Sequence, residues 1–78
     1  MAKQIVSGEN PFKAAKFQFA VGPSESGYQI AYSVNKEDWT LDPDAVVPAN
    51  ETLIYNGSMQ YAWYKLVGNT SDNVEIIL

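Results

Sequence analysis

Residues 32–40 read YSVNKEDWT, where a strand-like alternation of apolar and polar residues runs into a polar turn. Apolar side chains at every second position are typical of a β-strand with one buried face. Trp39 follows the turn at once. Such a stretch either carries a site in its turn or forms a hairpin that places an aromatic ring in a core. We interpret it as a structural hairpin with Ser33 and Asn35 in the turn. Trp39 is then expected to pack on the tyrosines of the preceding strand, because buried rings dominate core energetics.

The same alternation recurs on both sides of this stretch. Strands are predicted at residues 16–21, 28–35, 52–55, 61–67 and 74–78. The Gly- and Pro-containing turn at 22–27 predicts that the strands on either side of it pair as a hairpin. Asn56-Gly57 predicts a second tight hairpin turn, since both residues tolerate positive φ. Two prolines within 42–50 exclude a central strand there and predict a surface crossover with an edge-like segment at 45–47.

Several short strands with regular turns, and no convincing helical period, predict an all-β fold: a small antiparallel β-sandwich or a partly open barrel. The 78 residues allow a single domain. We expect residues 13–78 to form this domain and residues 1–12 to form an extended N-terminal arm. The pair Ile5-Val6 either stays in the arm or adds a strand. A domain this small buries a modest core, so its stability is expected to depend on partners.

The composition excludes several chemistries. The chain contains neither cysteine nor histidine, and all five basic residues are lysines. Thiolate metal sites, thiol nucleophiles and histidine bases are therefore ruled out, and no serine can join a catalytic triad. The acid pairs Glu37/Asp38 and Asp42/Asp44 match no calcium loop and are read as solvated turn residues. We expect no catalytic residue, no metal and no cofactor.

The formal net charge of −4 argues against nucleic acid as a partner. Three lysines near the start, Lys3, Lys13 and Lys16, are read as a solvated edge or a contact to an acidic neighbour. The sequence shows no secretory signal and no apolar run long enough for a membrane helix. We therefore expect a protein that is made in a cytoplasm and does not contact a membrane.

Aromatic residues make up 13% of the chain, and three of them lie almost side by side near its end. In a strand, Tyr61 and Trp63 point to one side and Tyr64 points to the other. Because only one side can line the core, at least one of these rings is expected to be exposed. Exposed rings either stack on sugars or anchor a protein interface.

The segments YSVNKEDWT (32–40) and YKLVGNTS (64–71) together resemble small β-sandwich modules on the virions of tailed bacteriophages, of the capsid-decoration or head-fibre type. The chain departs from that pattern at Lys36-Glu37, where those modules carry glycine. The resemblance implies a non-enzymatic protein that sits on a capsid, forms a homo-oligomer, with a trimer as one possibility, and joins the virion in the host cytoplasm.

We therefore expect a structural protein that binds a capsid or other virion proteins. The alternative is a carbohydrate-binding module that stacks sugar on Trp39, Tyr61, Trp63 or Tyr64. The predicted partner-binding residues are Ile5, Val6, Pro11, Phe12, Tyr61, Trp63 and Tyr64. The predicted structural hairpin residues are Ser33, Asn35, Trp39, Asn56 and Gly57.

Overall fold

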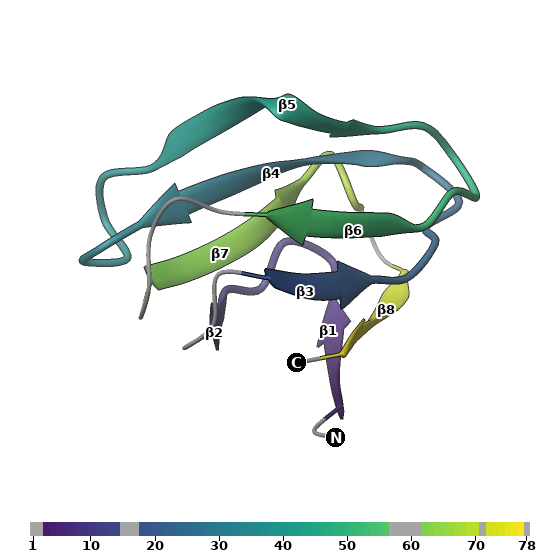
Figure 1. Cartoon of the computed structure of the whole chain (residues 1–78), viewed down its shortest axis with the longest axis horizontal. Helices are drawn as coiled ribbons and strands as arrows, with labels where there is room; N and C mark the ends of the chain where they lie inside the picture. The colour runs from purple at the N-terminus through teal and green to yellow at the C-terminus, as the bar shows by residue number, and fades with distance from the viewer. Residues whose placement is uncertain (1–2, 15–17, 57–61, 71, 78) are drawn as a thin grey trace.

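The computed structural model describes residues 3–14, 18–56, 62–70 and 72–77, which fold into two four-stranded antiparallel sheets packed face to face (Figure 1). Sheet A has the order β1 (Lys3–Ser7), β8 (Asn73–Ile77), β3 (Gln18–Val21) and β6 (Leu53–Asn56). Sheet B has the order β2 (Phe12–Ala14), β7 (Ala62–Val67), β4 (Tyr28–Ser33) and β5 (Thr40–Val47). The predicted all-β sandwich is confirmed, and the two sheets do not close into a barrel.

The core lies between the sheets and is built around four aromatic rings. Phe12 and Tyr64 come from sheet B, and Phe19 and Tyr55 come from sheet A. Five pairs of these rings have centroids between 5.0 and 5.8 Å apart. Such pairs contribute about 0.5–1.5 kcal/mol each beyond the burial of their area. Aliphatic side chains at alternate strand positions fill the rest of the core: Val6, Val21, Ile30, Val47, Leu66, Val74 and Ile76.

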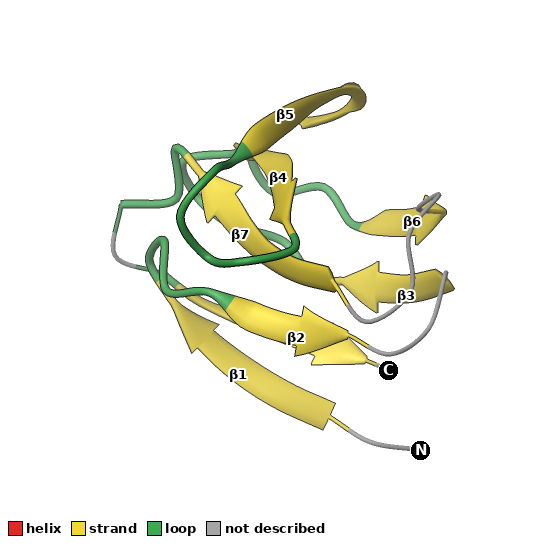
Figure 2. Ribbon diagram, turned by 90° about the vertical axis from the view of Figure 1, so that its left-hand side faces the viewer, coloured by secondary structure: helices red, strands yellow, loops and turns green. Residues whose placement is uncertain are grey.

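Two of the predicted hairpin pairings are wrong. The strands on either side of the turn at 22–27 belong to different sheets, β3 to sheet A and β4 to sheet B (Figure 2). The turn stays with sheet A at its start, because the Gly22 N–H donates to the Glu75 carbonyl at 2.8 Å. Gly27 then takes a φ of +72° where a Cβ would lie 2.8 Å from a backbone oxygen, so only glycine fits this crossing to sheet B. Similarly, β6 pairs with β3, whereas β7 pairs with β2 and β4.

The expected arm over residues 1–12 is wrong, whereas the alternative that Ile5-Val6 adds a strand is confirmed. β1 pairs with β8 at all five of its positions and forms an edge of sheet A. Phe12 begins β2 in the other sheet and lies opposite Tyr64. Val6 and Phe12 are 5% and 3% exposed. These residues supply an edge strand to sheet A and the first residue of β2 to sheet B. They are therefore part of the domain, which does not begin at residue 13.

The prediction that the proline-containing stretch forms no central strand is confirmed, but the expected surface crossover is wrong as far as residue 47, because β5 runs from Thr40 to Val47. β5 is an edge strand, carries Pro43 and shifts its register against β4 between Gln29 and Ala31. Edge strands tolerate proline because one side of the strand needs no hydrogen-bond donor. The Tyr55 hydroxyl of sheet A donates to Asp42 Oδ2 at 2.8 Å, which ties β5 to β6 across the side of the sandwich.

Three buried tyrosines are expected to make the stability of the fold depend on pH in the alkaline range. Burial raises the pKa of Tyr28 from 10.0 to about 12. Burial also raises the pKa of Tyr64, and it raises that of Tyr55 together with the hydrogen bond to Asp42. Because the folded state holds these protons more tightly than the unfolded chain, their stabilising contribution is complete below pH 10 and is lost as pH rises toward 12.

We expect tyrosinate absorbance from these residues to appear in one cooperative step above pH 10, together with loss of the β circular-dichroism signal. Gradual titration of all tyrosines near pH 10, with an unchanged dichroism spectrum, would contradict the burial of these rings.

Candidate binding surface

The turn between β4 and β5 is closed by its own polar side chains. Asn35 Oδ1 accepts hydrogen bonds from the N–H groups of Glu37 and Asp38, both at 2.9 Å. The Ser33 hydroxyl accepts from the N–H groups of Asn35 at 3.1 Å and Lys36 at 3.0 Å. Lys36 takes a positive φ of 66°. The turn therefore holds its own backbone in a defined shape, and this shape places the Lys36 side chain.

Trp63 lies on the outer face of sheet B beneath two lysines. Its neighbours across the strands are Lys13 of β2 and Ser33 of β4. The Nζ atom of Lys36 is 4.4 Å from the centroid of the Trp63 ring, and that of Lys13 is 5.7 Å away. The quadrupole of the ring attracts ammonium groups at such distances, by about 0.5–1 kcal/mol each at exposed sites. The turn and two strands thus converge on one indole.

Trp39 lies on the same outer face, so the expectation that it packs on the tyrosines of β4 is wrong. The Nζ atom of Lys65 is 4.6 Å from the centroid of the Trp39 ring. Lys65 points outward, because its neighbours along β7, Tyr64 and Leu66, point inward and are buried. Trp39 is half-buried and lies outside the core cluster. It extends the outer surface that begins at Trp63.

Aliphatic side chains continue this surface onto β5. Leu41 is 50% exposed and lies opposite Ala31. Val46 is 63% exposed and lies opposite Gln29. Polar and apolar groups therefore share one continuous outer surface of sheet B. We call it the tryptophan–lysine face and define it by Lys13, Lys36, Trp39, Leu41, Val46, Trp63 and Lys65.

The tryptophan–lysine face is cationic on an acidic protein. It holds three of the five lysines, although the chain has a net charge of −4. The paired outward positions of β2, β4 and β7 carry no carboxylate: Lys13, Gln29, Ala31, Ser33, Trp63, Lys65 and Val67. Glu37 and Asp38 lie at its rim, in the β4–β5 turn. On sheet A, by contrast, Lys3 is paired with Glu75 at 3.4 Å.

Three of the predicted partner-binding residues are not at the surface. Val6, Phe12 and Tyr64 are 5%, 3% and 1% exposed. Their prediction as contact residues is wrong, because their side chains form the core on which both sheets pack. Tyr64 cannot serve as a sugar platform for the same reason.

The other predicted residues are scattered. Ile5 and Pro11 are exposed, but they lie at β1 and in the β1–β2 connection, away from the outer face of sheet B. Trp63 belongs to the tryptophan–lysine face. Asn56 is the exposed last residue of β6. Tyr61 and Gly57 lie outside the described residues.

Sequence reasoning missed the lysines of this face. For Lys65 the signal was present, since a residue two positions after Trp63 in the same predicted strand shares its side. For Lys36 and Lys13 no local signal exists, because their neighbour in space is distant in sequence.

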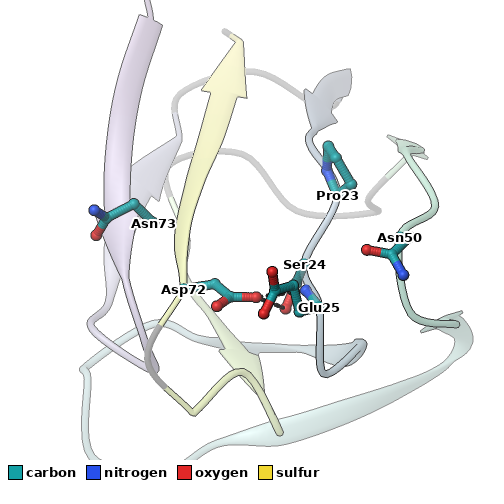
Figure 3. Close-up of a pocket in the computed structure, with 6 residues that line it drawn as sticks. All are labelled: Pro23, Ser24, Glu25, Asn50, Asp72 and Asn73. Atoms are coloured by element: carbon teal, nitrogen blue, oxygen red, sulfur yellow. Dashed lines mark hydrogen bonds between the residues drawn. The ribbon is translucent and has the colours of Figure 1, made fainter.

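The loops at one end of the sandwich line an open hollow of about 320 Å³. It is lined by Pro23, Ser24, Glu25, Asn50, Asp72 and Asn73 (Figure 3). Asp72 Oδ2 accepts from the Glu25 N–H and lies 3.3 Å from the Ser24 hydroxyl oxygen. Figure 3 shows Asp72 directed at these two residues while Asn73 points away from them. The carboxylate of Asp72 thus anchors the neighbouring loop.

Beneath this hollow lies the fully buried amide of Asn69. Asn69 Oδ1 accepts from the Ser24 hydroxyl at 2.8 Å. Its Nδ2 donates to the carbonyls of Gly8 at 2.9 Å and Asp72 at 3.1 Å. A buried amide with its hydrogen bonds satisfied rigidifies its surroundings. These polar groups therefore tie three loops together, which is a structural role.

Within the described ranges, no three acidic, cysteine or histidine side chains gather in a way that could hold a metal ion. The described part of the chain also contains no helix long and apolar enough to cross a membrane. No protein-family model, curated protein or solved structure matches this chain.

Proposed function

We propose that the chain is a non-enzymatic virion accessory protein, which attaches to a capsid surface through the tryptophan–lysine face. The observation that carries this proposal is the gathering of two tryptophans and three lysines on one outer face, where the paired outward positions of β2, β4 and β7 carry no carboxylate. Tryptophan is enriched among the residues that dominate binding energies at protein interfaces. Surrounding cations steer a partner of opposite charge and fix its orientation. The partner surface is therefore expected to be acidic.

The position of the lysines favours a protein partner over a sugar. A sugar ring binds an indole by lying flat on an open face of it. Here Lys36 and Lys65 hold their ammonium groups 4.4 and 4.6 Å from the two ring centroids. A sugar would have to displace them and lose the cation–π attraction. A carboxylate on a protein surface can instead meet the ammonium group where it already lies.

The choice of a capsid rests on the resemblance of residues 32–40 and 64–71 to capsid-decoration and head-fibre modules. A capsid presents the same surface many times, so many copies of a small domain can decorate one particle. Linked copies further gain apparent affinity without any new contact. This suits a single small domain with one binding face.

The experiment measures which lysines become protected from chemical modification when the chain binds to capsids. The chain is mixed with capsids of the phage that encodes it, purified without the chain, and its lysines are acetylated in the free and the bound state. We expect protection of Lys13, Lys36 and Lys65 on binding, whereas Lys3 on sheet A should react as in the free chain. Mass spectrometry of the acetylated peptides gives the readout.

Lys3 is the matched control, since it is an exposed lysine paired to Glu75 on the other sheet. Protection of Lys3 with no change at the three lysines of the face would show that another surface docks. Failure of the chain to bind the particles would contradict the virion assignment itself.

A further inference from the structure

The four edge strands of the described structure differ in how open they are to pairing. β5 contains Pro43 and a register shift, β2 has three residues and β6 has four. β1 has five residues, pairs in register with β8 from Lys3 to Ser7 and contains neither proline nor glycine. Proteins block exposed edges with prolines, bulges and short strands. β1 has none of these, and its one charged residue stands at its first position.

Two hydrogen bonds at the end of β1 fix which backbone groups face the open edge. The Gly8 N–H donates to the Asp72 carbonyl at 3.1 Å, so this pair faces β8. The Ser7 carbonyl accepts from the Asn10 N–H at 3.1 Å and therefore points away from β8. Along an antiparallel strand, the N–H and C=O groups of successive residues point alternately toward and away from the neighbouring strand. The residues whose backbone faces the open edge are Lys3, Ile5 and Ser7, and of these groups the Ser7 carbonyl is already engaged by the Asn10 N–H.

The edge is complementary to itself. If two copies of β1 run antiparallel about a two-fold axis at Ile5, Ile5 meets Ile5 of the second copy and Lys3 meets Ser7. No like charges face each other, whereas parallel in-register pairing would set Lys3 against Lys3. Ile5 is 56% exposed on the outer face of sheet A. A two-fold contact of this kind is closed and uses the same patch on both partners.

We infer that β1 pairs antiparallel with β1 of a second copy about an axis at Ile5, joining the two A sheets into one eight-stranded sheet. Main-chain hydrogen bonds supply the affinity of such strand addition. The interface belongs to the edge of sheet A, whereas the tryptophan–lysine face is the outer side of sheet B. The inference therefore stands independently of the proposed function.

Analytical ultracentrifugation of the purified chain over a range of concentrations tests the pairing. We expect a dimer that dissociates on dilution. Ile5→Lys places two lysines against each other at the axis, and like charges directly opposite destabilise strand pairing. It should raise the dissociation constant by about tenfold or more, the equivalent of about 1.4 kcal/mol.

Ile54→Lys is the matched control, because Ile54 is 57% exposed on β6, the opposite edge of the same sheet. It should dimerise as the unaltered chain does. Equal weakening by both variants would overturn the inference, as would a chain that is monomeric at every concentration or one that forms a trimer.

A backbone variant gives a second, sharper test. Ile5→Pro removes the N–H that faces the open edge and leaves the ladder with β8 intact, since the backbone of residue 5 faces away from β8. We expect a monomer whose circular dichroism keeps the β-sheet spectrum. A folded Ile5→Pro chain that still dimerises would overturn the inference. If this variant does not fold, Ile5→Lys remains decisive.

Discussion

A chain that lacks residues 1–12 is expected not to fold. The deletion removes β1, the edge of sheet A, and the first residue of β2 in sheet B. It also removes Val6 and Phe12 from the core, where Phe12 contacts the rings of Phe19 and Tyr64 at centroid distances of 5.7 and 5.8 Å. Burial of such side chains stabilises a fold by about 1.5–3 kcal/mol each, before any loss of strand pairing is counted.

The single substitution Phe12→Ala measures how much the packing of this side chain in the core contributes to stability, without removing a strand. It should lower the free energy of unfolding by about 3–5 kcal/mol, the cost of removing a buried phenylalanine and leaving a cavity. Domains are commonly stable by only about 5–15 kcal/mol, and one of 78 residues is expected near the lower end. The variant is therefore expected to be partly or wholly unfolded at ambient temperature, as measured by urea titration followed by circular dichroism.

Ile54→Ala provides the comparison, because it shortens a large apolar side chain that is 57% exposed. It should change stability by about 0.5 kcal/mol at most. A shortened chain, residues 13–78, that unfolds cooperatively with the stability of the whole protein would show that the first residues are a separable arm.

The fold class could be predicted from the sequence because alternation is a local property. Tyr28, Ile30 and Tyr32 face the core as their spacing indicates, and so do Tyr64 and Leu66. Sheet membership could not be predicted in the same way. A strand buries one of its sides both when the next strand pairs with it and when the next strand crosses to the opposite sheet. The sequence of the turn at 22–27 therefore does not distinguish these two arrangements.

The strand at Phe12–Ala14 could not be predicted from the sequence for a related reason. β2 has three residues, Phe12 to Ala14, and a strand this short shows no measurable period. The segment between β1 and β2 has the composition of a linker, since it contains Gly8, Asn10 and Pro11. Only the pairing of Phe12 with Tyr64, distant in sequence, reveals the strand.

The binding surface was predictable in part. The expectation of an exposed ring near the end of the chain is not met by the described rings, because Tyr64 is buried and Trp63 is half-buried on the outer face of sheet B. Lys36 could not be placed over that ring, because its position depends on the shape of the β4–β5 turn and on the pairing of β4 with β7. Such a contact is a product of the tertiary structure.

The second large effect is expected from reversing charges on the tryptophan–lysine face. Lys36→Glu and Lys65→Glu each replace an ammonium group over an indole by a carboxylate. Close charge pairs across interfaces contribute about 1.5–7 kcal/mol, so each reversal should weaken attachment to an acidic capsid surface by about tenfold or more. Added salt should weaken binding of the unaltered chain as well, because exposed charges are screened.

Both variants should remain folded, since the side chains they alter lie outside the core. Thermal unfolding followed by circular dichroism checks this. Lys3→Glu changes the net charge by the same amount on sheet A and serves as the control for a general loss of attraction.

The proposal that the tryptophan–lysine face docks on a capsid is tested most directly by co-sedimentation of these three variants with capsids of a phage whose genome carries the chain's gene. We predict that Lys36→Glu and Lys65→Glu stay in the supernatant at concentrations where the unaltered chain and Lys3→Glu sediment with the particles. Equal sedimentation of all four chains would contradict the proposal.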